Sequence, residues 1–369
     1  MGVLSDKFGV PPFSVLDSKQ GYWIERKKEW KDFGIVSDEG RDVKFLPSAE
    51  TRPSWKKYNK NLADPTKNAT VSIFDPVLTE LMYKWFCDRG GIILDPFTGG
   101  SVRGIVASQL GYRYTGFDIR QEQIDANNNN LDTLQFPISK PNWICDDSEK
   151  LLQYVDEEVD MIFSCPPYHD LEKYCKNPND LSNMDYDAFL IKYKSIIKNA
   201  CSKLKDNAFA VFVVSEIRDK NGFYKNFVRE TINAFEECGL VHYNEMIYLN
   251  QIGTLPIRTS GSFISGRKVG KNHQNIICMF KANPKELKPL SIEGNDFTPL
   301  VELENKPLNK VVEKNEPRVI EFLEDKVEDK VEDKVEEIVV KTICEVCGVD
   351  YQGSTREEHE ARRFHQDYV

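Results

Sequence analysis

Short apolar runs alternate with amphipathic segments from about residue 71 onward. Each run reads as a buried parallel strand, and the runs are Ile92–Leu94, Tyr112–Phe117, Trp143–Cys145, Met161–Phe163 and Ala208–Val214. Between them, apolar residues recur at helical spacing, as in the segment that follows Asp75 and Pro76. Aspartate is a favoured N-cap and proline a favoured first helical residue. This alternation predicts an α/β fold with a mostly parallel sheet and helices on both faces.

Two further apolar runs follow Ala208–Val214 along the chain, at Val241–Leu249 and Asn275–Phe280. The segment between them is a basic loop that contains Arg258, Arg267, Lys268 and Lys271. Successive strands with no helix between them favour antiparallel pairing. We therefore expect a hairpin at one end of the sheet.

Acidic residues end three successive strands, at Asp95, Asp118 and Asp146. Open α/β sheets bind ligands at the carboxyl ends of their strands, where an acidic residue can accept hydrogen bonds from ribose hydroxyls. Gly99 and Gly100 follow the first of these strands and let backbone approach a ligand closely. The pattern predicts a nucleotide-like cofactor, and the alternative is a tight turn that binds nothing.

A rigid aromatic turn follows the strand Met161–Phe163. Its four residues are Cys165, Pro166, Pro167 and Tyr168. Two prolines cannot continue a β-ladder, so the tyrosine ring is held at the carboxyl edge of the sheet. Taken alone, the turn could simply end a strand and pack its tyrosine; the glycine loop upstream favours a functional role.

Together, this tetrad and the Asp95–Ser101 loop resemble those of the amino-group DNA methyltransferases, which make N6-methyladenine or N4-methylcytosine. The resemblance covers about residues 72–282 and extends, more loosely, to methyltransferases of phages and mobile elements. It implies a seven-stranded sheet of the Rossmann-like type, S-adenosylmethionine as cofactor and double-stranded DNA as partner. The cofactor contacts that it implies come from Phe74, Asp75, Asp95, Phe97, Gly99, Gly100, Asp118 and Asp146.

The tetrad carries the chemistry that the resemblance implies. Its first side chain and the next backbone carbonyl would accept hydrogen bonds from the base amine, while Tyr168 would stack on a base flipped out of the duplex. Cys165 stands where the family usually has Asp, Asn or Ser, and a thiol is a weak acceptor. Its serine-like size leans toward N4-cytosine, with N6-adenine open. The glycine loop also departs from the family, reading Gly99-Gly100-Ser101 where Gly-Ser-Gly is common.

Two other functions fit the same residues. Some RNA base methyltransferases share a similar loop and tetrad. A DNA-binding or protection protein without catalysis would also fit, if Cys165 had disabled the site.

The N-terminal accessory segment, residues 1–70, interleaves aromatic rings with cations. Trp23, Arg26 and Trp30 begin this pattern, and Trp55 and Lys56 repeat it. Basic residues beside aromatic ones suit phosphate contact and base stacking. The alternative is an amphipathic helix packed on the main domain, residues 71–284, with its basic face in solvent.

The C-terminal part divides into a charged linker, residues 285–341, and a candidate zinc finger, residues 342–369. The linker repeats Glu-Asp-Lys-Val, which would place like charges four residues apart in a helix and favours a flexible or marginally helical spacer over a coiled coil. The spacing of Cys344, Cys347, His359 and His365 is that of a two-Cys/two-His site and resembles matrin-like fingers. A finger here could contact a second nucleic acid or a protein.

Composition adds limits rather than a function. The net charge of −10 does not indicate a general nucleic-acid coat. No apolar run approaches the ~20 residues that a membrane span needs, so we expect no membrane partner. Nine scattered cysteines and no leader-like start favour a reducing cytoplasm, in a bacterium or a phage-infected cell.

Overall fold

The computed structural model describes residues 3–35, 74–134, 139–169, 177–250, 252 and 255–283. The chain separates into two compact units, Met1–Pro307 and Leu308–Val369, and all described residues belong to the first. The charged linker and the four candidate zinc ligands, Cys344, Cys347, His359 and His365, lie outside the described residues. The predicted domain boundaries stay predictions.

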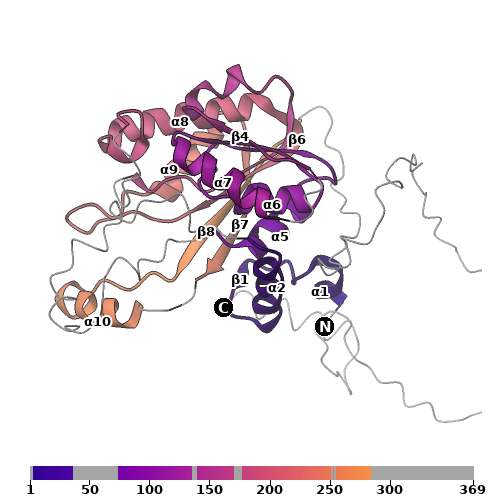
Figure 1. The fold of residues 1–369 in the computed structure, drawn as a ribbon. Helices are drawn as coiled ribbons and strands as arrows, with labels where there is room; N and C mark the ends of the chain where they lie inside the picture. The colour runs from indigo at the N-terminus through magenta and orange to yellow at the C-terminus, as the bar shows by residue number, and fades with distance from the viewer. Residues whose placement is uncertain are drawn as a thin grey trace, which may run out of the picture. The chain divides into compact units, whose positions relative to one another are not determined.

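One eight-stranded sheet organises the fold (Figure 1), in the order β1-β7-β8-β6-β5-β2-β3-β4. The strands are β1 (Val15–Asp17), β2 (Ile92–Asp95), β3 (Arg113–Asp118), β4 (Asn142–Cys145), β5 (Val159–Ser164), β6 (Leu204–Val214), β7 (Val241–Leu249) and β8 (His273–Lys281). Only β8 runs antiparallel to its neighbours, so the predicted α/β fold with a mostly parallel sheet is confirmed.

The predicted count of seven strands is wrong, because β1 adds an eighth. It pairs in parallel with β7, through Val15–Ile247, Leu16–Tyr248 and Asp17–Leu249. Three residues are too few for an alternating pattern to be visible, and only Leu16 is buried. The strand exists because the β7 edge is available to it.

The predicted hairpin is confirmed as an antiparallel pair, β7 with β8. Two details differ. The connection, expected as a basic loop, contains the helix α10 (Leu255–Gly266), and β7 is covered by β1 rather than lying at the edge. Serine, threonine and glycine fill much of α10, and these residues favour turns in a sequence pattern.

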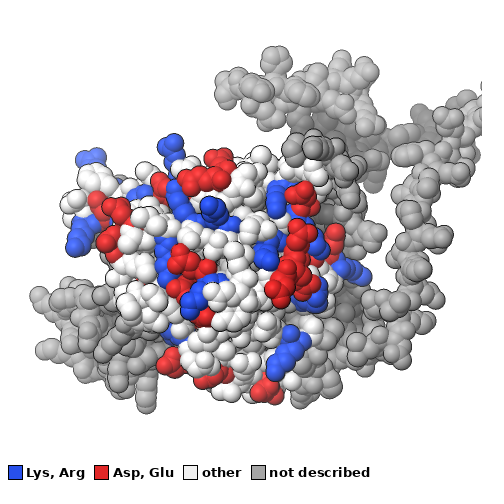
Figure 2. Space-filling model, turned by 90° about the horizontal axis from the view of Figure 1, so that it is seen from above, with Lys and Arg blue, Asp and Glu red and all other residues white. Residues whose placement is uncertain are grey.

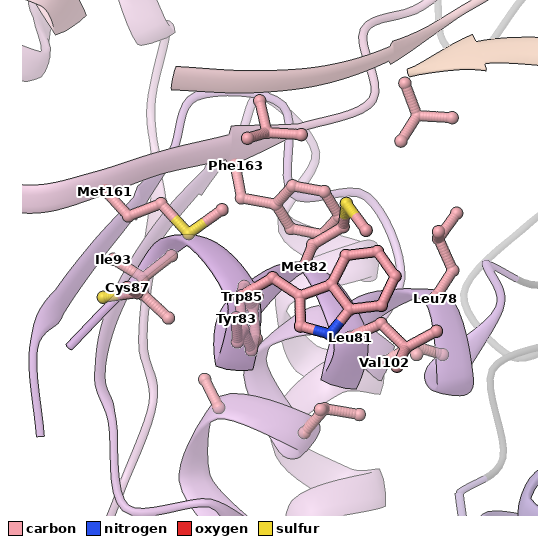
Figure 3. Packing of buried hydrophobic residues seen from close by; sticks show 14 of the residues in the cluster. Leu78, Leu81, Met82, Tyr83, Trp85, Cys87, Ile93, Val102, Met161 and Phe163 are labelled. Carbon is pink, nitrogen blue, oxygen red and sulfur yellow. The ribbon is translucent and has the colours of Figure 1, made fainter. Parts of the chain in front are cut away.

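Helices cover both faces of the sheet (Figure 1). Alternate strand residues serve the two sides: Met161 and Phe163 join one apolar cluster and Ile162 joins the other. Besides α10, the helices are α1 (Val3–Phe8), α2 (Gly21–Asp32), α5 (Pro76–Phe86), α6 (Val102–Gln109), α7 (Gln121–Thr133), η3 (Ser148–Gln153), η5 (Leu181–Asn183), α8 (Tyr186–Lys203) and α9 (Phe227–Glu236). The first cluster packs against helices on the side of α5 (Figure 3), and the second packs against α8 and α9.

Caps set where two of these helices begin. Asp75 caps α5 as predicted, accepting hydrogen bonds from the backbone N–H groups of Val77 and Leu78. The cap of η3 is Asp147, whose side chain accepts a hydrogen bond from the N–H of Glu149. The Ser148 hydroxyl donates to the carbonyl of Pro96, 2.5 Å away, and so ties η3 to the loop after β2.

The aromatic and basic residues of α2 pack on the main domain. Trp23 and Trp30 are fully buried, and the indole N–H of Trp30 donates to Glu80 at 2.8 Å. Arg26 forms two hydrogen bonds to the same carboxylate, at 2.9 and 2.7 Å. This helix therefore packs on the main domain, and Arg26 and Lys27 face that domain rather than solvent. Trp55 and Lys56 lie outside the described residues.

Surface charge is mixed on the face that Figure 2 shows, where basic and acidic side chains are intermingled. The acidic excess of the chain therefore does not form a single field on this face. None of the helices that the structure describes is long and apolar enough to span a membrane.

Candidate active site

A cavity of about 440 Å³ lies at the carboxyl ends of β2, β3 and β5. Its size is within the range of small-molecule sites, which are ~300–1,000 Å³. Most of the predicted cofactor and catalytic residues line it: Phe74, Asp75, Phe97, Gly99, Gly100, Asp118, Cys165, Pro166, Pro167 and Tyr168. The fold thus brings the glycine loop and the aromatic tetrad to one space.

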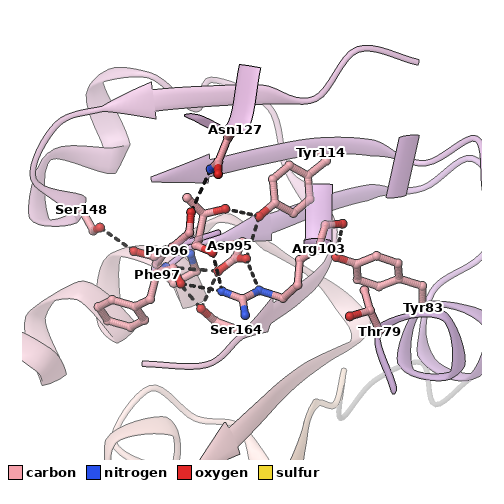
Figure 4. A network of polar contacts seen from close by, with 12 residues as sticks. Thr79, Tyr83, Asp95, Pro96, Phe97, Arg103, Tyr114, Asn127, Ser148 and Ser164 are labelled. Carbon is pink, nitrogen blue, oxygen red and sulfur yellow. Dashed lines mark hydrogen bonds and ion pairs between the residues drawn. The ribbon is translucent and has the colours of Figure 1, made fainter. Parts of the chain in front are cut away.

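Asp95 lies beneath the cavity and does not line it. The side chain is completely buried, and its carboxylate accepts hydrogen bonds from Arg103, Tyr114 and Ser164 (Figure 4). The N–H of Phe97 donates to it as well, at 3.1 Å. Burial, and then the charge of this carboxylate, hold the pKa of Tyr114 well above its ordinary value. Asp95, the last residue of β2, therefore helps to fix the conformation of the glycine loop that follows the strand.

Arg103, the second residue of α6, holds the loop from the other side. Its Nε lies 2.6 Å from Asp95, and its Nη2 donates to the carbonyls of Phe97 and Thr98 at 2.6 and 2.9 Å. Burial alone would lower the pKa of this guanidinium, but the charge of the adjacent Asp95 carboxylate outweighs burial and raises that pKa. The guanidinium also lies 4.6 Å from the centre of the Phe74 ring.

Gly99 has the backbone conformation that the predicted close approach requires. Its φ is +51°, in the left-handed region where residues with a Cβ are strained. Its carbonyl accepts a hydrogen bond from the Asn127 amide, 2.8 Å away. The loop is therefore already held in one shape by α6 and α7.

The strand ends β3 and β4 place their acidic residues differently. Asp118 lines the cavity and accepts a hydrogen bond from the N–H of Arg120 at 2.8 Å. Asp146 does not line it; hydrogen bonds from Lys150 and Tyr154 lower the pKa of this carboxyl to about 2. The next residue, Asp147, lines the cavity instead and pairs with Lys192. An offset of one residue at a strand end is beyond what periodicity can resolve.

The tetrad closes the opposite wall. The Cys165 sulfur lies 3.8 Å from the Tyr168 hydroxyl oxygen, which also accepts a hydrogen bond from the Gln274 amide at 2.8 Å. The Tyr168 ring packs edge-on to Phe227, with centroids 6.4 Å apart. His169 follows with a positive φ of 49°, so the chain turns sharply after the tyrosine. Asp170 and Glu172, possible extra acceptors, lie outside the described residues.

Several lining residues have no signal in the sequence that points to this site. Arg103 lies just after the glycine loop, whereas the others come from segments far from either motif; these are Ser18, Lys27, Lys192, Tyr248, Asn250 and Gln274. Only the tertiary fold brings α2, α8 and the β7–β8 pair to the cavity. No group of three or more metal-binding side chains occurs among residues that the structure describes.

No protein-family model matches this chain, and no curated protein matches it. Solved structures with a similar fold include TrmN from Thermus thermophilus, at 14% identity and a TM-score of 0.39, covering 58% of this chain and 51% of that one. An rRNA methylase from Streptococcus thermophilus shares 16% identity at a TM-score of 0.36 (58% and 100% covered). Precorrin-6y C5,15-methyltransferase from Geobacter metallireducens GS-15 shares 13% identity at a TM-score of 0.36, and the match covers 56% of this chain and 87% of that one. This chain thus matches about half the length of TrmN.

Proposed function

We propose that the protein is an S-adenosylmethionine-dependent methyltransferase that modifies an exocyclic amine of a DNA base. The observation that carries this proposal is the single cavity lined by both the glycine loop and the Cys165–Tyr168 tetrad. A nucleoside methyl donor and an aromatic base must meet in one space, and these two motifs offer surfaces for each.

The cavity residues suit the cofactor chemically. Asp118 presents a carboxylate where ribose hydroxyls could donate, and Gly99 and Gly100 present backbone without side chains. When bound, the cofactor supplies a methyl group on a positively charged sulfur. The work of the protein is to hold that methyl group in line with the amine.

The tetrad would hold the acceptor base. Tyr168, with its hydroxyl fixed by Gln274, offers a ring on which a flipped base can stack. Cys165 and the Pro166 carbonyl are the acceptors for the amine hydrogens, which would free the nitrogen lone pair for attack. Held by Cys165, the Pro166 carbonyl and Tyr168, the amine would take the methyl group that the cofactor supplies and would release one proton to solvent.

DNA is the proposed substrate, with N4-cytosine favoured over N6-adenine because Cys165 has the size of serine. The β7–β8 connection supports contact with a polyanion: residues 255–271 contain four basic residues and no acidic one. Phe263 and Ile264 in this connection are 50% and 83% exposed and offer apolar surface on which the bases of a DNA strand could pack.

Transfer of tritiated methyl groups tests the proposal. The purified protein is incubated with labelled cofactor and either mixed DNA or mixed RNA, and the digested nucleosides are separated. Label in N4-methylcytosine or N6-methyladenine supports it, and Tyr168→Ala should abolish the signal while the exposed Tyr243→Ala keeps it. Label found only in RNA would show that the substrate is RNA and not DNA. Cofactor binding without any methyl transfer would indicate a non-catalytic protein.

We also propose one structural zinc ion at Cys344, Cys347, His359 and His365, on the spacing of these residues alone. Metal analysis of the full chain should find about one zinc per chain, as a single four-ligand site requires. Truncation after residue 285 should remove the metal and keep cofactor binding. Zinc retained by the truncated chain would contradict the assignment.

A further inference from the structure

The Asp75 carboxylate, which the family resemblance assigns to the methionine part of the cofactor, is already occupied by the protein itself. Its Oδ1 accepts from Val77, Leu78 and Trp23, at 2.9, 3.1 and 3.2 Å. Its Oδ2 accepts from Lys27 at 2.7 Å and from the Tyr248 hydroxyl at 2.9 Å. A carboxylate has about four acceptor positions. Five donors therefore leave no room for a ligand ammonium.

Lys27 differs in having donors to spare. Its ammonium carries three N–H bonds, and the hydrogen bond to Asp75 is the one recorded for it among the described residues. The side chain is 31% exposed, against 4% for Asp75, and it lines the same cavity. A cation held at one point, with further donors directed to a ligand space, is a typical carboxylate site.

The position of Lys27 is set by the packing of α2. Trp23 and Trp30 on the same helix are fully buried, and each indole N–H donates to a carboxylate of the main domain, Asp75 and Glu80. Burial would raise the pKa of Glu80, but hydrogen bonds from Arg26 and the charge of Lys84 outweigh it and hold that pKa at about 2. Because α2 is fixed by these contacts and Lys27 is already bonded to Asp75, Lys27 would lose little side-chain freedom on binding a ligand.

We propose that Lys27 binds the α-carboxylate of the methionine part of the cofactor, and that Asp75 is the positioning residue that holds Lys27 in place. This inference rests on the proposed function. It assigns a role in the active site to α2, whose aromatic and basic residues the sequence suggested for contact with nucleic acid. Asp118, at the carboxyl end of β3, lines the same cavity, whereas Asp75 is bonded to Tyr248 of β7, so an extended ligand would have separate contacts for its two parts.

Calorimetry with two ligands tests the assignment. One ligand is S-adenosylmethionine, and the other is its decarboxylated form, which keeps the sulfonium and the ammonium. Lys27→Met should weaken the first ~10- to 100-fold, the usual range for a lost hydrogen bond between charged groups, and leave the second within ~twofold of wild type. Lys27→Arg should keep most of the preference for the carboxylate. Lys28→Met, an exposed neighbour on the same helix, is the matched control and should change neither affinity.

The outcomes separate this inference from the proposed function. If the wild-type chain bound neither ligand, the proposed function itself would fail. If it bound both and Lys27→Met weakened them equally, or weakened neither, the carboxylate assignment alone would be overturned. Melting curves of each variant, run without ligand, identify any general loss of structure, which would also lower both affinities together.

Discussion

Replacing Arg103 with methionine should lower the stability of the protein more than breaking an exposed ion pair would. The change keeps most of the aliphatic stem but removes the guanidinium. Asp95 would then be left as a completely buried carboxylate without its cation, and the carbonyls of Phe97 and Thr98 would each lose a hydrogen bond. Breaking a buried pair in this way costs ~3–5 kcal/mol.

Thermal unfolding measures this cost. For a domain of this size each kcal/mol lowers the unfolding temperature by ~2–4 °C, so Arg103→Met should melt ~6–20 °C below wild type. Arg113→Met is the control: Arg113 makes two hydrogen bonds to Glu157, at 3.0 and 2.9 Å, but both side chains are more than half exposed. Such a pair contributes only ~0–1 kcal/mol.

A second variant isolates the charge. Asp95→Asn with Arg103→Met removes both members, so the double change should cost less than the sum of the two single changes. Equal melting of Arg103→Met and Arg113→Met would refute the reasoning, because it would mean that the buried carboxylate finds another partner or water.

Three further predictions concern the site and its supports. Asp118→Ala should weaken S-adenosylmethionine binding ~10- to 100-fold by calorimetry, because a hydrogen bond to a carboxylate contributes ~1.5–3 kcal/mol; unchanged affinity would remove Asp118 from the site. Cys165→Ser should methylate as fast as wild type or faster in the tritium assay, since a hydroxyl accepts better than a thiol; wild-type rates in both Cys165→Ser and Cys165→Asp would make the thiol a spectator. The pKa of Glu80, lowered from 4.5 to about 2, predicts that its contribution of ~3 kcal/mol is present above pH 4.5 and is lost as the pH falls toward 2. Melting curves across this range should converge with those of Glu80→Gln at the acid end, and parallel curves would contradict the pKa.

Local chemistry in the sequence determined the mostly parallel core of the sheet and the two motifs, the glycine loop and the tetrad, that line the cavity. Periodicity located the strands, and the strand ends then located Asp118, Gly99 and the tetrad, because parallel strands present their carboxyl ends at one edge. Proline and glycine carry this information locally, since each restricts or frees the backbone without help from distant residues.

Tertiary packing alone decided three things: the strand β1, the helix α10, and the donors that surround the carboxylates of Asp95 and Asp75. Whether a carboxylate faces a ligand or the interior depends on which donors the fold brings to it. Arg103 and Tyr114 reach Asp95 from α6 and β3, and Lys27 reaches Asp75 across 48 residues of chain. These contacts are set by burial and geometry between distant segments, and no pattern of neighbours along the chain encodes them.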